Sequence, residues 1–320
     1  MHPIRIGYLS TMYHTSHILR TMDWVQARLG RVATWQLFGT GPAMVDAFAM
    51  GALDIGYLGV PPAMIGIGRG VPIVCIAGGH VEGTVMIGPR HAPRAVAADD
   101  IPAVLHYLAG KKIGVPARGS IHDVIMRWLI NTMGASTPEV VNYPWADLIP
   151  EAINEHVIAA GAGTPQLAAV ARTFYDLDIL IGPELLWPFN PSYGIVVRRA
   201  LLQERTLLEE FLLLHEDACN LIRLQPEAAA RIVADAVRVV DETFVKAVFS
   251  LSPRYCASLP RPYIDAAMAF VPVLMSMGFL STTLTEEAVF DSSFIAPVHP
   301  ENHHYGVDTT DSARYSFYPH

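Results

Sequence analysis

The chain has little cysteine and no long hydrophobic run. Its 320 residues include three cysteines, Cys75, Cys219 and Cys256, which are too few and too scattered for a disulfide framework or a Cys-X-X-Cys metal site. A stretch of about 18 consecutive apolar residues, which a membrane-spanning helix requires, is also missing. The sequence therefore predicts free thiols and no transmembrane segment.

Clustered positive charge is missing as well. The formal net charge is −8, and charged residues make up only 16 % of the chain. Nucleic-acid binding requires a basic face, so the sequence excludes nucleic acid as a partner. Apolar residues, at 52 %, are abundant enough for a large core, which argues against disorder.

The beginning of the chain lacks a secretory leader. Met1-His2-Pro3 leads directly into the first apolar stretch, without the basic segment, hydrophobic segment and cleavage site of a signal peptide. Two interpretations follow. If Met1 is the native start, we expect a cytoplasmic protein; if a leader was trimmed, we expect a periplasmic or cell-surface protein.

Residues 38–82 alternate short apolar runs with glycine-rich turns and helix starts. Residues 54–59 predict a buried strand, which ends where Pro61 opens a helix. A second apolar run, residues 71–77, ends at Gly78-Gly79-His80. Strand ends that meet glycines and helix N-termini are where open α/β sheets bind small ligands. This segment therefore predicts a small-molecule site.

These features resemble the nitrate/sulfonate/taurine-type and thiamine-pyrimidine-type solute-binding proteins of ABC transporters. The resemblance covers roughly residues 4–298, and rests further on Ile4-Arg5-Ile6-Gly7-Tyr8, Gly51-Ala52-Leu53-Asp54-Ile55-Gly56, Lys111-Lys112-Ile113-Gly114-Val115-Pro116 and Phe290-Asp291-Ser292-Ser293-Phe294. It implies the type II periplasmic-binding-protein fold, an α/β fold with two lobes, a hinge and a helical C-terminal region. The fold does not identify the ligand.

The resemblance also implies a division of the chain into three parts. Residues 1–88 and 196–298 would form a discontinuous lobe 1, residues 89–195 would form lobe 2, and residues 299–320 would form a C-terminal extension. Two crossovers between the lobes, expected near residues 88–100 and 183–195, would make a hinge that closes around a ligand.

Ligands of this family lie in the cleft, held by strand-end loops of both lobes. Carried over loop by loop, the resemblance assigns ligand binding to Ser10, Met12, Tyr13, His14, Phe38, Gly39, Leu58, Gly59, Gly79, His80, Arg118, Ser120, Gly163 and Thr164, and the aromatic Trp187 is added as a candidate stacking wall. Hydroxyls at helix N-termini suit an anion or a carbonyl, a guanidinium suits a carboxylate, sulfonate or phosphate, and aromatic rings suit stacking.

Each assignment competes with an ordinary structural role. Ser120 would act only as a helix cap, Arg118 would be a solvated loop residue, and Tyr13, Phe38 and Trp187 would pack in the core. The same holds for the two histidines of the predicted loops, which would be structural or solvated.

A neutral imidazole donates and accepts a hydrogen bond at once, which suits a heterocyclic ligand. The predicted loops also contain few cations. The sequence therefore favours an aromatic or heterocyclic small organic ligand over an organic anion.

Neither a metal site nor a cofactor is predicted. His14 and His17 are three residues apart, and His299, His303 and His304 cluster near the end of the chain. A zinc site needs three or four convergent ligands, however, and the sequence identifies no others. The histidine-rich segment is interpreted as an extension that packs on the surface or lines a contact between subunits.

Two main functions remain open. The chain contains no G-X-S-X-G, H-E-X-X-H or P-loop motif, so the first hypothesis is a solute-binding protein without catalytic residues, which delivers its ligand to the membrane subunits of an ABC importer or senses it. The alternative is a leaderless cytoplasmic enzyme on the same fold, chorismate-dehydratase-like or pyrimidine-synthase-like, with His14, His80 and Glu82 as acid/base groups. A third hypothesis gives residues 299–320 a role in protein interaction.

Overall fold

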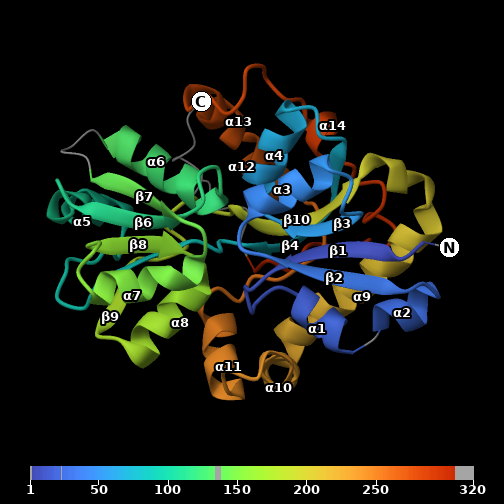
Figure 1. Cartoon of the computed structure of the whole chain (residues 1–320), viewed down its shortest axis with the longest axis horizontal. Coiled ribbons are helices and arrows are strands. Elements are labelled where there is room, and N and C mark those ends of the chain that lie inside the picture. The colour runs from blue at the N-terminus through green and yellow to red at the C-terminus, as the bar shows by residue number, and fades with distance from the viewer. Residues whose placement is uncertain (1, 23, 134–137, 307–320) are drawn as a thin grey trace.

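The computed structural model describes residues 2–22, 24–133 and 138–306 and shows two α/β halves that lie side by side (Figure 1). Each half is built on a five-stranded sheet, in the orders β2-β1-β3-β10-β4 and β7-β6-β8-β5-β9. Residues 307–320 of the predicted extension lie outside the described residues. Within the described part of the chain, no helix is both long and apolar enough to cross a bilayer.

The first sheet contains β1 (Ile4–Leu9), β2 (Ala33–Phe38), β3 (Ile55–Leu58), β4 (Ile73–Val81) and β10 (Pro191–Arg198). Its helices are α1 (Ser16–Thr21), α2 (Trp24–Leu29), α3 (Gly41–Ala49), α4 (Val60–Gly68), η3 (Arg199–Gln203), α9 (Arg205–Leu224), α10 (Pro226–Val237), α11 (Glu242–Leu251), α12 (Arg261–Met268), α13 (Phe270–Ser276) and α14 (Glu286–Val289). The run from α9 to α13 confirms the helical C-terminal region.

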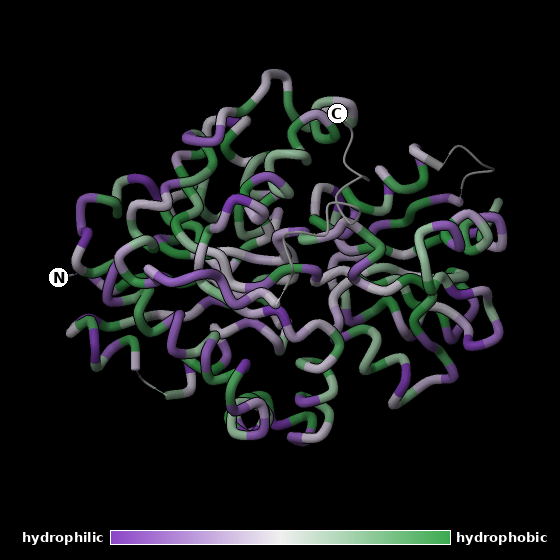
Figure 2. Tube along the Cα trace, turned by 180° about the vertical axis from the view of Figure 1, so that it is seen from behind, coloured by the Kyte–Doolittle hydropathy of each residue, from purple (hydrophilic) through white to green (hydrophobic). Residues whose placement is uncertain are grey.

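The second sheet contains β5 (Val85–Pro89), β6 (Lys112–Pro116), β7 (Glu139–Tyr143), β8 (Ala160–Gly163) and β9 (Leu177–Ile181). Its helices are η1 (Ala98–Asp100), α5 (Ile101–Tyr107), α6 (Ile121–Met133), η2 (Ala146–Leu148), α7 (Ile149–Asn154) and α8 (Pro165–Phe174). Figure 2 shows hydrophilic and hydrophobic residues alternating along the outer helices of both halves, as expected where one helix face packs on a sheet.

The two sheets repeat one pairing scheme. In the first, β1 pairs in parallel with β2 and β3, and β10 is antiparallel to β3 and β4. In the second, β6 pairs in parallel with β7 and β8, and β5 is antiparallel to β8 and β9. Each sheet therefore contains one strand that is antiparallel to its neighbours. Only the first half is discontinuous in sequence, because β10 joins the sheet of β1, β2, β3 and β4 after the chain has passed through the whole second half.

The crossovers lie earlier in the chain than the sequence suggested. The chain leaves the first sheet after Val81 and enters the second at Val85, then returns between Ile181 and Pro191. The expected boundaries at 88/89 and 195/196 fall inside β5 and β10, and the expected first crossover near residues 88–100 is wrong. The error arose because an isolated apolar strand such as β5 does not reveal which sheet it joins.

The crossovers are tied to each other by Glu82. Its main-chain N–H donates to the carbonyl of Asn190 at 2.8 Å, and its Oε1 accepts a hydrogen bond from the main-chain N–H of Phe189 at 3.0 Å. Glu82 and Phe189 both have φ of 58°, in the left-handed region that non-glycine residues seldom occupy. Such backbone is retained where surrounding contacts enforce it, which suits a defined hinge.

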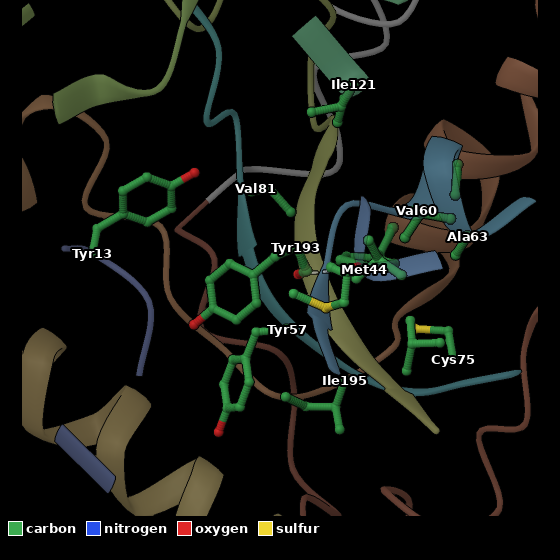
Figure 3. Packing of buried hydrophobic residues seen from close by; sticks show 14 of the residues in the cluster. Tyr13, Met44, Tyr57, Val60, Ala63, Cys75, Val81, Ile121, Tyr193 and Ile195 are labelled. Atoms are coloured by element: carbon green, nitrogen blue, oxygen red, sulfur yellow. Dashed lines mark hydrogen bonds between the residues drawn. The ribbon is translucent and has the colours of Figure 1, made fainter. Parts of the chain in front are cut away.

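The core of the first half reaches the cleft through a row of aromatic side chains. Figure 3 shows Tyr13, Tyr193 and Tyr57 in succession, with ring centroids 6.3 Å and 6.0 Å apart between neighbours. All three side chains are buried, and Met44 and Ile195 pack in the same cluster. The loop after β1 is thereby held by the core rather than by solvent-exposed contacts.

Candidate ligand-binding site

A cavity of about 50 Å³ lies between the two sheets, where strands of both halves end. Its lining follows β1, β2 and β3 on one side and β6 and β8 on the other. The lining residues are Leu9, Ser10, Thr11, Tyr13, His14, Gly39, Thr40, Gly41, Gly59, Pro62, Pro116, Ser120, Ile121, His122, Ala146, Thr164 and Ser192. Parallel strand ends meet at this place because both sheets have the same topology.

Four helices begin at the cavity. The N-terminal residues of α3, α4, α6 and α8 are preceded there by Thr40, Gly59, Ser120 and Thr164. Thr40 Oγ1 accepts from the main-chain N–H of Ala43 at 3.5 Å, and Ser120 Oγ accepts from that of Asp123 at 3.2 Å. The dipoles of these helices place a partial positive charge at the cavity, which favours an anion or a carbonyl oxygen. Prolines in the first turns of α3, α4 and α8 supply no N–H, so the dipoles and the remaining main-chain N–H groups provide the attraction.

The lining of the cavity mixes apolar side chains with hydroxyls and two imidazoles, and it carries no charged side chain among the described residues. Burial lowers the pKa of His14 well below its usual range and that of His122 to about 3, so both rings are neutral at pH 7. His122 Nδ1 lies 3.0 Å from Thr84 Oγ1. His14 Nδ1, by contrast, has no hydrogen-bond partner among the described residues, although the side chain is only 2 % exposed. The His14 ring therefore keeps a hydrogen-bonding atom that the protein does not use.

One aromatic ring belongs to the lining. The hydroxyl of Tyr13 lies 2.7 Å from Ser192 Oγ, and the two rings of Tyr13 and His14 meet edge to face with centroids 4.8 Å apart. The imidazole of His14 also packs on Tyr193 at 4.0 Å. These contacts hold His14 in one orientation, as a binding site on a loop requires.

The two halves touch across the cavity. The main-chain N–H of Met12 donates to Gln166 Oε1 at 3.0 Å, and Gln166 Nε2 donates to Asp147 Oδ1 at 3.1 Å. The approach is also close at Gly39, where a Cβ atom would lie 2.8 Å from the carbonyl oxygen of Pro144. The structure is thus a closed form of the cleft.

A larger hollow exists at the far end of the second sheet, with a volume of about 660 Å³. It lies beside the start of β6, and its charged lining residues Lys111, Lys112 and Asp176 are exposed. Four helix N-termini and a buried imidazole with an unused nitrogen distinguish the smaller cavity. We therefore assign the site to the interlobe cavity.

The structure brings together seven of the fifteen residues expected to bind ligand. The seven that line the cavity are Ser10, Tyr13, His14, Gly39, Gly59, Ser120 and Thr164. Four others lie directly beside the lining: Phe38, Leu58 and Gly163 end β2, β3 and β8, and Met12 makes the main-chain contact to Gln166.

Gly79 and His80 do not line the cavity, because β4 continues through them to Val81. A Cβ atom at Gly79 would lie 2.2 Å from the ring of Tyr193, so this glycine allows close packing inside the sheet rather than a turn. His80 is fully buried, and its Nε2 donates to the carbonyl of Ser252 at 2.6 Å. The expected ligand loop at residues 78–80 is therefore wrong.

Arg118 and Trp187 also lie outside the cavity lining. Arg118 is exposed, with its guanidinium 5.5 Å from the centre of the Phe279 ring. Trp187 is buried in the core, where it stacks on Phe270 at 4.0 Å and donates from Nε1 to the carbonyl of Ala266 at 3.1 Å. Arg118 is therefore a solvated loop residue and Trp187 a core residue, which are the structural alternatives that the sequence left open.

Sequence reasoning missed several lining residues. His122 lies on the first turn of α6, two positions after Ser120, and Ser192 is the second residue of β10. The position of His122 in the first turn of a predicted helix could have identified it as a cavity residue. Ser192 had no local signal, because it reaches the cavity only through the antiparallel pairing of β10 with β3 and β4.

Glu82, the third acid/base residue of the enzyme hypothesis, belongs to the crossover. Its Oε2 lies 2.9 Å from Arg254 Nε, and its carboxylate is 2 % exposed. The hydrogen bond to Phe189 occupies its other oxygen. Of the three candidate catalytic groups, only His14 lines the cavity.

Comparisons with known proteins agree with this architecture. The model of the NMT1-like family matches residues 1–237. A protein of Brucella abortus (strain 2308), named only as a binding protein, is 23 % identical over 242 residues, which span 74 % of this chain and 72 % of that protein.

Two solved structures illustrate the shared fold. The alkanesulfonate-binding protein SsuA from Xanthomonas axonopodis pv. citri superposes with a TM-score of 0.75 at 19 % identity, over 90 % of this chain and 98 % of that one. The periplasmic nitrate-binding protein NrtA from Synechocystis PCC 6803 superposes with a TM-score of 0.73 at 12 % identity, over 92 % and 88 %. The expected periplasmic-binding-protein fold is confirmed, and the match over residues 1–237 shows that the chain belongs to the NMT1-like family.

Proposed function

We propose that the chain binds a small organic solute by an oxygen-bearing head group, such as a sulfonate or carboxylate, and delivers it to the membrane subunits of an ABC importer. The observation that supports this most is the meeting of four helix N-termini at a closed, uncharged cavity. Main-chain N–H groups and helix dipoles stabilise a negative charge without a cationic side chain.

Cavity size and lining both favour a compact polar head group over an aromatic ring. A volume of about 50 Å³ holds on the order of four water molecules. Of the three stacking walls that the sequence suggested, Phe38 and Trp187 are not part of the lining, and only Tyr13 is. The two solved structures are named for nitrate and alkanesulfonate, which are both oxyanions.

The enzyme hypothesis receives no support from the site. His80 and Glu82 are held by Ser252 and Arg254 away from the cavity. His14 alone has no acid/base partner in the lining except His122, and burial keeps both rings neutral far below pH 7. Groups with such low pKa values are weak proton acceptors at neutral pH.

Calorimetric titration with methanesulfonate, acetate, nitrate and the neutral ring pyrimidine tests the head-group proposal. We expect one or more of the three anions to bind and pyrimidine not to bind. Ser120→Ala and Thr164→Ala should each weaken binding about fivefold, since each removes a hydrogen bond of about 1 kcal/mol. Ser250→Ala, an exposed serine outside the cavity, is the matched control.

Binding of pyrimidine in preference to every anion would contradict the proposal. So would wild-type affinity in both cavity variants. Native mass spectrometry of the loaded protein, followed by release of the ligand, separates binding from catalysis, because a binding protein returns the ligand unaltered.

A further inference from the structure

Residues 299–306, which we call the C-terminal segment, pack on α9 and on the loop that follows α11. Tyr305 is fully buried, and its hydroxyl donates to the carbonyl of Cys256 at 2.6 Å. The main-chain N–H of His304 donates to Cys256 Sγ at 3.3 Å. The segment is therefore held in a fixed position against the first half of the molecule.

This packing brings four metal-binding side chains together. Ligand atoms of Glu216 on α9 and of His299, Glu301 and His304 on the C-terminal segment all lie within 4.8 Å of one another. His299 Nδ1 is 3.1 Å from Glu216 Oε1 and 3.8 Å from Glu301 Oε1. The sequence showed the histidines but not Glu216, because only the fold places α9 beside them.

His299 is the residue that points to a ligand. Its side chain is fully buried, and Nδ1 makes no hydrogen bond to any described residue despite its closeness to Glu216. Nε2 lies 3.3 Å from the carbonyl of Asn302. A carbonyl oxygen only accepts, so this contact favours a proton on Nε2, which also lies 3.6 Å from Cys256 Sγ, and in that tautomer the lone pair of Nδ1 faces a carboxylate.

Two facing lone pairs repel each other, and the arrangement is costly in a buried site unless a proton or a metal cation lies between them. Histidine ligands of metal ions characteristically donate their other N–H to a main-chain carbonyl, as His299 does to Asn302. His304 Nδ1 likewise has no hydrogen-bond partner among the described residues.

We propose that a divalent cation of the zinc type binds between α9 and the C-terminal segment, held by Glu216, His299, Glu301 and His304. Two imidazole nitrogens and two carboxylates form a four-ligand set that suits zinc, whereas calcium and magnesium prefer oxygen ligands alone. The two carboxylates balance the charge of the ion. The site shares no residue with the ligand cavity, so it is independent of the proposed transport function.

Binding at this site would join the C-terminal segment to α9. Because the metal binds the folded chain and not the unfolded one, it would raise the thermal midpoint, and above Kd the stabilisation grows with the logarithm of the metal concentration. The role is therefore structural rather than catalytic.

The test uses the full chain, purified without a polyhistidine tag and stripped with a chelator. Calorimetric titration with zinc chloride should show one strong site per chain, and the thermal midpoint should rise on zinc addition. Glu301→Gln and His304→Ala should each weaken zinc binding at least about tenfold. Glu301 has a half-exposed side chain, so its substitution leaves the packing intact.

His303→Gln is the matched control, because His303 lies in the same segment but outside the ligand set. It should bind zinc as the wild type does. Absence of zinc binding to the stripped chain would overturn the proposal. Unchanged affinity in Glu301→Gln and His304→Ala would also overturn it, since zinc would then be bound elsewhere.

Discussion

The hydroxyl of Ser10 donates a hydrogen bond to Oδ2 of Asp147 at 3.1 Å, across the cavity between the two halves. Ser10 follows β1 of the first sheet, and Asp147 lies in η2 of the second half. The other carboxylate oxygen accepts from Gln166, which in turn accepts from the main chain of Met12. We name these four residues the cleft latch, because the hydrogen bonds of Ser10 to Asp147 and of Met12 to Gln166 join the two halves.

Removal of the latch should weaken ligand binding without unfolding the protein. Asp147→Ala eliminates the hydrogen bond from Ser10, which spans the cleft and stabilises the closed form by about 1 kcal/mol. It also removes the hydrogen bond from Gln166, which lies within the second half. We therefore expect Kd to rise about fivefold, because part of the binding free energy must then drive closure. Calorimetric titration of the cavity ligand measures the change.

Asp99→Ala provides the control for the latch prediction, since Asp99 is an exposed aspartate of the second half. It should bind as the wild type does. Small-angle scattering of ligand-free Asp147→Ala should show a larger radius of gyration than the wild type. An unchanged radius together with unchanged Kd would show that the latch does not govern closure.

His80→Ala should reduce stability and leave ligand affinity unchanged. The variant removes a fully buried imidazole and leaves the carbonyl of Ser252 without its donor. We expect a loss of about 3 kcal/mol in the free energy of unfolding, measured by urea denaturation. A changed Kd with wild-type stability would contradict this prediction and would support the role in ligand binding that the sequence suggested for His80.

That error shows where sequence reasoning was sufficient and where it was not. Strand ends followed by a helix start gave Gly59, Ser120 and Thr164 correctly as cavity positions, because the pattern is local. Gly78 and Gly79 resemble the glycines that follow a strand, but here glycine is required because side chains distant in sequence pack against the strand. A Cβ atom at Gly78 would lie 2.2 Å from the hydroxyl of Tyr305, a residue far away in sequence.

The fold class was predictable, since alternating strands and helices favour paired α/β halves. The membership of β5 in the second sheet was not, because a strand sequence does not encode which sheet it joins. The contact between α11 and α8, where Phe244 and Phe174 have ring centroids 5.9 Å apart, is of the same kind. Strands or helices that are distant in the sequence and meet only in the folded chain leave no local sequence pattern that predicts their contact.

Asp54→Asn should destabilise the first sheet. The carboxylate accepts from Arg5 Nε and Nη2 at 2.9 Å each and from Arg198 Nη2 at 2.8 Å, and its side chain is 8 % exposed. Burial raises the pKa of Asp54, but the hydrogen bonds from Arg5 and Arg198 outweigh it, so the net pKa lies below the ordinary value. We expect a loss of about 2 kcal/mol, less than for a fully buried pair because both arginines reach solvent.

Urea denaturation measures the effect, and Asp46→Asn is the matched control. Asp46 pairs with Arg69 at 3.0 Å on the surface, where both side chains are more than half exposed. Its substitution should leave stability near that of the wild type. Equal stability of the two variants would show that the Asp54 ion pairs contribute no more than a surface pair.

Mild acid should destabilise the protein through its buried histidines. Burial lowers the pKa of His17 and His215 to about 4 and that of His80 and His122 to about 3. In the unfolded chain these rings take up protons below about pH 6.5, whereas in the folded chain they stay neutral. The unfolded state thus binds more protons between pH 6.5 and the folded pKa values, so stability falls as the pH falls.

Each ring contributes a slope of up to about 1.4 kcal/mol per pH unit in that window. His215→Gln should therefore reduce the slope of unfolding free energy between pH 6.5 and 4.5 by about one proton, as measured by urea denaturation at several pH values. The exposed His2→Gln is the control and should keep the wild-type slope. A free energy independent of pH across this window would mean that the buried rings are protonated in the folded state, which their packing against Tyr13, Tyr57 and Tyr193 opposes.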